Sequence, residues 1–223
     1  MKENYKVENG VGIIPEGVTS ICNDAFRGCE SLTNVVIPEG VTSIGNGAFY
    51  WCLSLTNITI PNSIKSIGDY AFYGCDLTDI VIPESITIIG NGAFWGCESL
   101  TSVAIPEGVT SIGDNTFAWC ESLSTVVIPE GVTSIGADAF YRCKSLTNIV
   151  IPEGVTSIGT HAFAWCRSLI SIVIPEGVVS IGNDVFAGCH NLQHIYVPKE
   201  LVDYYKSMDS LSEYTDIISA YEE

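Results

Sequence analysis

Apolar side chains recur along this chain at fixed places within a unit of 23 residues. Every unit begins at a proline, and when positions are counted from it, Val or Ile stands at position 4, Ile at 7, Phe at 12, Leu at 18, and Val or Ile at 21 and 23. The prolines are Pro15, Pro38, Pro61, Pro83, Pro106, Pro129, Pro152, Pro175 and Pro198, and one interval is shortened to 22 residues. A fixed period of this length is typical of a solenoid, in which equivalent residues of successive repeats stack into inward ladders.

Three elements are expected in each repeat. The Leu-x-x-Ile-x-Ile run before each proline alternates inward and outward positions, as a short strand does. Proline then ends that strand because it has no N–H to donate to a ladder. The following Val-Thr-Ser-Ile-Gly is a second extended run, and Ala-Phe-x-x-Cys lacks two-residue alternation, so one helical or 3-10 turn is expected there.

The two ends depart from the repeat. Residues 1–14 are interpreted as a degenerate first strand that caps the N-terminus, and residues 15–198 as eight repeats. Residues 199–223 are interpreted as a helical cap, broken once near Ser210, because apolar residues recur there every three or four positions. These residues are Leu201, Tyr205, Met208, Leu211, Tyr214, Ile218 and Tyr221.

The string IPEGVTSIGNGAFYWCLSLTNITIP, residues 37–61, resembles the BspA-like (bacterial surface antigen A type) leucine-rich repeat, as do its equivalents from Ile14 to Val197. The terminal YVPKELVDYYKS is similar to the cap of such arrays. The resemblance implies an α/β repeat fold, a curved and strand-rich leucine-rich-repeat solenoid with short helical or 3-10 turns and a helical C-terminal cap. It also implies protein–protein contact, adhesion or host interaction, a cell-surface or secreted location, and no catalytic residues.

The net charge of the chain limits the kinds of partner that it is expected to bind. Nine Lys and Arg against 26 Asp and Glu give a formal net charge of −17, which argues against nucleic acid and against anionic lipid. No apolar run is long enough to span a membrane, so no membrane insertion is expected. The polar start MKENYKVENG shows no leader, so a cytoplasmic location stays open beside the surface location.

Cysteine forms a ladder at position 15, with Cys22 alone at a position usually held by Gly. Disulfides between neighbouring repeats are one interpretation, and buried thiols filling a narrow slot are the favoured one. Cys189, His190 and His194 lack a second ligand pair, so no metal and no cofactor is expected. The Glu that follows most prolines is interpreted as a solvated acidic edge rather than a calcium site.

The outward positions of the Leu-x-x-Ile-x-Ile strand are the first candidate for binding protein. Position 22 forms a mildly apolar row, and its neighbours are mostly Thr, Ser and Asn. Such a row marks a contact site or reflects strand propensity alone. Its members are Val36, Thr59, Val81, Ala104, Val127, Val150, Val173 and Tyr196.

A second candidate lies at positions 13 to 16, which hold all four tryptophans. Aromatic side chains there either pack between repeats or serve as binding hot spots. Position 16 changes from acidic to basic along the chain, which suits a charged partner or head-to-tail association. The residues of this secondary edge are Trp51, Trp95, Trp119, Trp165, Arg142, Lys144 and Arg167.

These features predict a non-catalytic module that binds a protein of unknown identity. Catalysis needs unlike groups that converge in a cleft, whereas polar residues here form ladders of like groups. The alternative is a structural spacer or self-assembling scaffold element, with weak self-association through the exposed row or the ends of the array.

Overall fold

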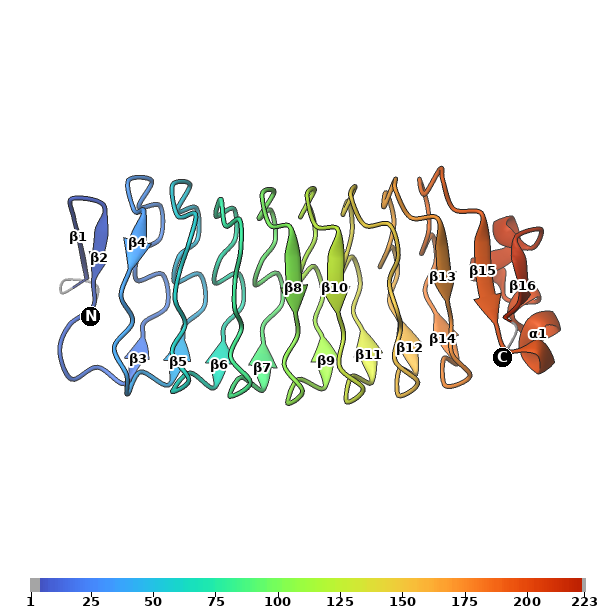
Figure 1. Cartoon of the computed structure of the whole chain (residues 1–223), viewed down its shortest axis with the longest axis horizontal. Helices are drawn as coiled ribbons and strands as arrows, with labels where there is room; N and C mark the ends of the chain where they lie inside the picture. The colour runs from blue at the N-terminus through green and yellow to red at the C-terminus, as the bar shows by residue number, and fades with distance from the viewer. Residues whose placement is uncertain (1–4, 222–223) are drawn as a thin grey trace.

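The structure is a computed structural model and describes residues 5–221. Figure 1 shows the repeats as coils stacked side by side in one row, with little curvature in that view. The strand-rich solenoid with a period of about 23 residues, expected from the sequence, is confirmed. Residues 1–4 of the expected N-terminal cap lie outside the described part of the chain.

The Val-Thr-Ser-Ile-Gly run forms the more regular of two parallel strand ladders. Within each of two four-stranded sheets, a Ser-Ile or Ile-Ile pair hydrogen-bonds to the equivalent pair of the next repeat, as in Ser43↔Ser66 and Ile44↔Ile67. The first sheet contains β3 (Ser20–Ile21), β5 (Ser43–Ile44), β6 (Ser66–Ile67) and β7 (Ile88–Ile89). The second contains β9 (Ser111–Ile112), β11 (Ser134–Ile135), β12 (Ser157–Ile158) and β14 (Ser180–Ile181).

The strand before the proline forms the other ladder, which is interrupted. Its strands are β4 (Asn34–Val35), β8 (Ser102–Ala104), β10 (Thr125–Val127), β13 (Ser171–Val173) and β15 (His194–Val197). β8 pairs with β10 and β13 with β15, while single bridges join Val36 to Thr59 and Val150 to Val173. Residues of position 22 therefore lie in register in four neighbouring pairs of repeats.

The Ala-Phe-x-x-Cys segment is a run of tight turns rather than one regular helical turn. Alternate N–H groups donate within the repeat, as Cys52 N does to Phe49 O at 3.1 Å. The others donate to the next repeat, as Phe49 N does to Ala71 O at 2.8 Å. Positions 10 and 14 take positive φ, for example 58° at Trp51 and 61° at Arg142, which bends the chain too sharply for a helix.

Phenylalanine forms the centre of the core. All eight rings are buried, and neighbours stack nearly parallel, with centroids from 5.3 Å apart for Phe49–Phe72 to 6.0 Å for Phe163–Phe186. Tyr5 covers the first ring edge-to-face at 5.4 Å, and Tyr214 covers the last at 5.7 Å. The ends of the stack are thereby shielded by aromatic edges, a favourable geometry for rings.

The cysteine ladder consists of free thiols rather than disulfides, and the buried-thiol interpretation is confirmed from Cys52 onward, whereas Cys29 is half-buried. From Cys52 onward, each thiol donates to the phenylalanine carbonyl of the preceding repeat, as Cys52 Sγ does to Phe26 O at 3.1 Å. Burial raises the pKa of Cys52 to about 12. These thiols therefore act as small core residues.

Glycine at position 8 is explained by close packing of the repeats. A Cβ on Gly45 would come within 2.7 Å of Asn23 N and of Ile21 O in the preceding repeat. Cys22 occupies this position in the first repeat, where its neighbour is the hydroxyl of Tyr5 instead. A side chain is tolerated there because no complete repeat precedes it.

Both ends differ in detail from the sequence-based expectation. The N-terminal segment is an antiparallel hairpin of β1 (Lys6–Glu8) and β2 (Val11–Ile13), and β2 pairs with β4. The C-terminal segment contains η2 (Lys199–Leu201), α1 (Val202–Lys206) and η3 (Asp209–Tyr214), so the helical pattern breaks after Lys206 rather than at Ser210.

The expected helix is wrong for the last residues of this segment. Ile218 lies in β16 (Ile218–Ala220), which pairs with β15 and extends its sheet. Tyr205 anchors the segment because its buried hydroxyl donates to Pro175 O and Val178 O at 3.0 and 2.8 Å.

Candidate binding surfaces

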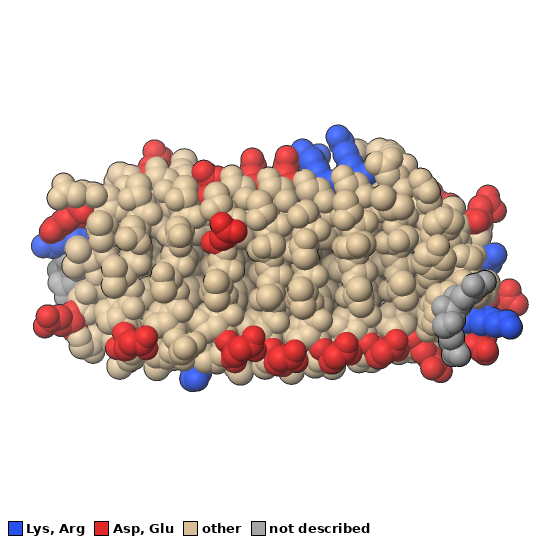
Figure 2. Space-filling view, viewed as in Figure 1, with Lys and Arg blue, Asp and Glu red and all other residues tan. Residues whose placement is uncertain are grey.

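The strand face, defined as positions 19, 20 and 22 of the repeats, is a nearly uncharged surface over the interrupted ladder. Valines of position 22 point outward and are 40% to 81% exposed, the extremes being Val173 and Val81. Asp79 and His194 are the two acidic or basic residues at these positions. Figure 2 shows this face almost free of charge between two charged edges. The structure thus places the position-22 candidates in one continuous row.

Hydroxyl groups beside this row are partly used within the protein. Thr101 Oγ1 donates to Thr78 O at 3.4 Å, and Ser124 Oγ donates to Thr101 O at 3.2 Å. At the C-terminal end of the row, the half-buried Tyr196 stacks on His194 with centroids 5.3 Å apart. A partner would therefore meet apolar methyl groups more than free donors.

Acidic residues border the strand face along one edge. Glutamates after the prolines lie in the turn between the two strand ladders and are exposed, and Figure 2 shows an acidic row along the lower edge. Because they point to solvent in single file, they repel one another and supply few oxygens at any one place. These residues are Glu16, Glu39, Glu84, Glu107, Glu130, Glu153 and Glu176.

The opposite edge, defined as positions 13 to 16, carries the aromatic residues and is called the aromatic edge. Tyr73 lies at its centre, stacked on Tyr50 at 4.5 Å and edge-to-face with Trp95 at 5.3 Å. Burial and the nearby Tyr50 raise the pKa of Tyr73. Trp51 stays 54% exposed. The rings thus pack between repeats and are also accessible.

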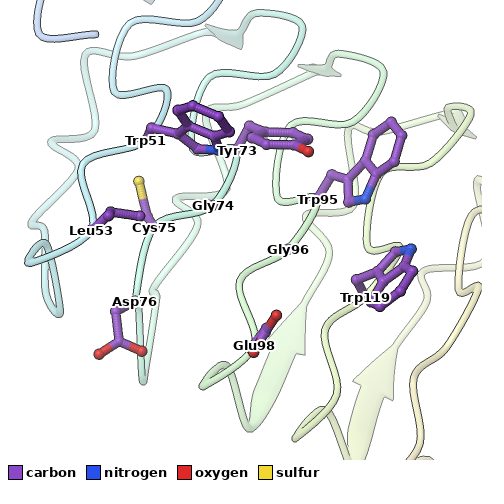
Figure 3. Close-up of a pocket in the computed structure, with 10 residues that line it drawn as sticks. All are labelled: Trp51, Leu53, Tyr73, Gly74, Cys75, Asp76, Trp95, Gly96, Glu98 and Trp119. Carbon is purple, nitrogen blue, oxygen red and sulfur yellow. The ribbon is translucent and has the colours of Figure 1, made fainter. Parts of the chain in front are cut away.

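A groove of about 620 Å³ opens in the aromatic edge between Trp51 and Trp119. Figure 3 shows the rings of Trp51, Tyr73, Trp95 and Trp119 in an arc, with Asp76 and Glu98 across the gap. Gly74 and Gly96 occupy position 14 in the two repeats between these tryptophans, so no side chain fills the space. Ser99 donates a hydrogen bond to Asp76 and orients its carboxylate.

The aromatic edge is closed farther along the chain. Arg142 stands at position 14, and its guanidinium lies 4.0 Å from the ring centroid of Trp119 and 5.6 Å from that of Trp165. Lys144 Nζ pairs with Glu121 Oε1 at 2.6 Å, and Arg167 lies 5.3 Å from the ring of Trp165. Figure 2 shows acidic followed by basic side chains along this upper edge.

The secondary-edge candidates therefore fall into two groups. Trp51, Trp95 and Trp119 share the groove, whereas Trp165 joins Arg142 and Arg167 in the closed part. The groove itself was not predicted from the sequence. Its signal was glycine at position 14 in two successive repeats, Gly74 and Gly96, between repeats that carry tryptophan there.

Metal-binding clusters and membrane-spanning helices are absent from residues 5–221. In that range, no three His, Cys, Asp or Glu side chains gather closely enough to hold a metal ion. His190 lies edge-to-face with Trp165 at 6.1 Å. No helix described there is long and apolar enough to cross a bilayer.

Comparison with known proteins gives the family. The BspA type leucine rich repeat region matches residues 12–117 and 110–218. No curated protein matches the chain. The matched ranges include the strand face, the groove and most of the C-terminal cap.

Solved structures with the same fold come from several bacteria. A leucine-rich repeat protein from Bacteroides ovatus is 29% identical with a TM-score of 0.73, and the match covers 94% of this chain and 59% of that one. A leucine rich cell surface protein from Faecalibacterium prausnitzii is 33% identical with a TM-score of 0.57, covering 92% and 64%.

The leucine-rich repeat protein of T. pallidum is 30% identical with a TM-score of 0.59, covering 85% of this chain and 87% of its own. This chain therefore spans about three fifths of the first two proteins and most of the third. The chain belongs to the BspA type leucine-rich repeat family.

Proposed function

We propose that this chain is a non-catalytic binding module of the adhesion or host-interaction type, which holds a protein partner against its strand face. The row of exposed valines at position 22 carries the proposal. A continuous apolar row on a protein with a net charge of −17 is a surface that a partner can cover without burying charge.

Energetics favour this face over the acidic row beside it. Covering apolar surface contributes roughly 25 cal/mol per Å², whereas desolvating a glutamate without a partner charge is unfavourable. The row also extends over all the repeats, and extended surfaces are what solenoids offer to partners. Only a large area can give affinity here, because no single residue of the row is an aromatic anchor except Tyr196.

The arrangement of polar groups supports a role without catalysis. Chemistry requires a nucleophile, a base and an oxyanion or metal site in one place. The strand face offers Thr, Ser and Asn in ladders, with several hydroxyls bonded to the preceding repeat. A cell-surface or secreted location is part of the proposal, and the name of the Faecalibacterium prausnitzii protein supports it.

The test is a double substitution, Val127→Lys with Val150→Lys, at two exposed positions of the row. A matched control, Ile88→Lys with Val179→Lys, adds the same charge at exposed apolar residues outside the row. Proteins captured from host-cell and matrix extracts by the original chain are purified and titrated against all three proteins. Loss of binding in the first variant alone is the expected result.

Two outcomes would contradict the proposal. Equal binding by both variants would remove the strand face from the interaction. Mass that rises with concentration in light scattering, and that the first variant abolishes, would show that the row joins copies of this chain. Circular dichroism establishes that the variants keep the fold.

A further inference from the structure

The groove in the aromatic edge has an internal counterpart two repeats away. At position 14 the repeats carry, in order, Gly28, Trp51, Gly74, Gly96, Trp119, Arg142, Trp165 and Gly188. Between Trp119 and Trp165 the intervening residue is Arg142, and its guanidinium lies against both rings. Between Trp51 and Trp119 the intervening residues are Gly74 and Gly96, and the space stays open.

The aromatic edge of this protein thus already binds guanidinium groups of its own arginines. Arg142 lies 4.0 Å from the centroid of Trp119 and 5.8 Å from that of Tyr141, within the range of cation–π attraction. At the other end of the array, Arg27 lies 4.6 Å from the ring of Tyr50. A planar guanidinium suits such sites because it stacks on aromatic faces and is weakly hydrated.

The charges around the groove also favour a cationic ligand. Asp76 and Glu98 also line the groove, on the side opposite the rings of Trp51 and Tyr73, and Figure 3 shows the Asp76 carboxylate directed away from these rings. Within residues 5–221, neither carboxylate is ion-paired with a lysine or arginine, whereas Glu121 beside the closed part is neutralised by Lys144. Aromatic faces and unneutralised carboxylates in one groove attract cations and reject anions.

We infer that the groove binds an arginine side chain presented by a basic segment of a protein partner. The inference rests on the proposed role in protein binding, but it uses a different surface from the strand face. The volume of about 620 Å³ is within the range of ligand sites and accommodates the arginine with parts of its neighbours in the segment. Stacking on the tryptophans and electrostatic attraction to Asp76 and Glu98 would act together on the basic segment.

The probe is hexa-arginine, with hexa-lysine, hexa-glutamate and maltohexaose for comparison. Binding is measured by calorimetry and by the indole N–H signals of the four tryptophans in NMR spectra. Trp51, Trp95 and Trp119 line the groove, so hexa-arginine is expected to move their signals and leave Trp165 in place. Hexa-lysine is expected to bind about tenfold more weakly because an ammonium does not stack.

The decisive variant is Gly96→Arg, which reproduces in the groove the arrangement seen at Arg142. The backbone at Gly96 has φ +73°, close to the 61° of Arg142, and an added Cβ would come no nearer than 3.7 Å to Gly74. The new side chain is expected to fill the groove and weaken hexa-arginine binding about tenfold or more.

A matched control is Gly17→Arg, which adds the same residue beside the acidic row on the other edge, outside the groove. Its backbone has φ +76°, and no atom lies within 4 Å of the added Cβ. Backbone strain and added charge are therefore alike in the two variants. Gly17→Arg is expected to keep binding within about twofold of the original chain, since it adds only a distant charge.

The carboxylates are tested with Asp76→Asn plus Glu98→Gln. The control, Glu130→Gln plus Glu153→Gln, removes the same charge from the exposed acidic row on the other edge. The first variant is expected to weaken hexa-arginine binding about five- to tenfold and to flatten its salt dependence, because two charges next to the ligand are removed. The second is expected to change it less than twofold.

Three results would overturn the inference. Equal binding of hexa-arginine and hexa-lysine, unaffected by Gly96→Arg, would mean general attraction to an acidic protein. Movement of the groove signals by maltohexaose alone would make the groove a carbohydrate site. No binding of hexa-arginine would end the assignment, while the strand-face test with Val127→Lys and Val150→Lys would still decide the proposed function separately.

Discussion

The aromatic edge is open over the third and fourth repeats and closed over the sixth, although the backbone follows the same path in both parts. At Gly74 and Gly96 the chain takes positive φ with no side chain, and a groove results. At Arg142 it takes positive φ with a guanidinium stacked on two tryptophans. The same backbone conformation therefore carries either an open groove or an arginine that fills the corresponding space, depending on the residue at position 14 of each repeat.

A second difference separates the same two parts of the molecule. In the earlier repeats, the side-chain oxygen at position 9 accepts a hydrogen bond from the N–H of position 9 in the next repeat. This ladder runs from Asn23 to Asp114, whose Oδ1 accepts from Ala137 N at 2.8 Å. Ala137 has no side-chain oxygen that could accept a hydrogen bond from the backbone N–H of Thr160, so the ladder ends there. The open groove lies where the inter-repeat bonding is more complete.

Phe117 belongs to the phenylalanine stack that joins the two parts, and it stacks on Phe94 at 5.5 Å and on Phe140 at 5.6 Å. Its substitution is expected to weaken the coupling between the two parts most strongly. The substitution Phe117→Ala is expected to destabilise the fold by about 3–5 kcal/mol because it leaves a cavity in the core. Urea unfolding followed by circular dichroism measures the loss. Because stability in such arrays depends on neighbouring interfaces, the transition should also split into two steps.

The solvent-exposed Val127→Ala serves as the control and should leave one transition near its original midpoint. A single, unshifted transition for Phe117→Ala would contradict the assignment of the phenylalanine stack as the coupling element.

The missing part of the position-9 ladder can be supplied by Ala137→Asn. The new side chain would give the N–H of Thr160 an acceptor, as Asp114 gives one to Ala137. We expect a gain of about 1 kcal/mol in the free energy of unfolding, the usual net value of one hydrogen bond. Hydrogen exchange should slow at Thr160.

The reverse substitution, Asn91→Ala, removes the acceptor of Asp114 N at 2.9 Å and should lower stability by a similar amount. If both substitutions leave stability unchanged, water replaces these bonds at no net loss, and the ladder does not distinguish the two parts.

The closed part can be opened by Arg142→Gly. Losing cation–π contacts costs about 0.5–2 kcal/mol. Removing a side chain from the left-handed region returns about 1–2 kcal/mol. The net change in stability is therefore expected to stay within about 1 kcal/mol, while hexa-arginine should now also move the indole signal of Trp165.

If hexa-arginine does not move the indole signal of Trp165 in the Arg142→Gly variant, the closed part is not an equivalent site. Lys144→Gln is the matched control, because it removes a neighbouring charge without removing the guanidinium that lies between the rings.

The smallest expected effect concerns access to the thiols and leaves stability untouched. Iodoacetamide at pH 8 is expected to modify the half-buried Cys22 and Cys29 and to spare the buried thiols from Cys52 to Cys166. Burial raises the pKa of Cys52 to about 12, so its reactive thiolate is a tiny fraction at this pH and increases only as the pH approaches that value.

Mass spectrometry of the labelled peptides identifies the modified residues. Cys120 lies in the middle of the array and should react only after unfolding. Modification of Cys120 at the rate of Cys29 would show that the inner repeats open as readily as the first one.

Much of the fold could be predicted because like residues stack on like residues in a repeat. The period placed Phe, Leu and Ile at the same depth in each coil, and the odd Cys22 could be recognised as different before its contact with Tyr5 was known. The position-22 row could likewise be placed on one outward face. Whether a partner covers that row is still a prediction, since composition does not identify a partner.

The remainder depended on contacts between residues far apart in the chain. The Ala-Phe-x-x-Cys segment bonds alternately to itself and to the next repeat, so its turns are shaped by a neighbour and not by local propensity. The spacing of apolar residues predicts that Ile218 is helical. In the structure, however, the edge of β15 is available for pairing, and the segment around Ile218 forms β16 along it.

The sequence by itself determined the period, the inward ladders, the buried thiols and the charges of the edges, because stacked copies of one unit bring equivalent positions together. The tertiary structure alone decided where the aromatic edge is open. The groove depends on the size of side chains in four successive repeats at once, on the ring of Tyr73 turned between Trp51 and Trp95, and on Arg142 filling the corresponding space beyond Trp119.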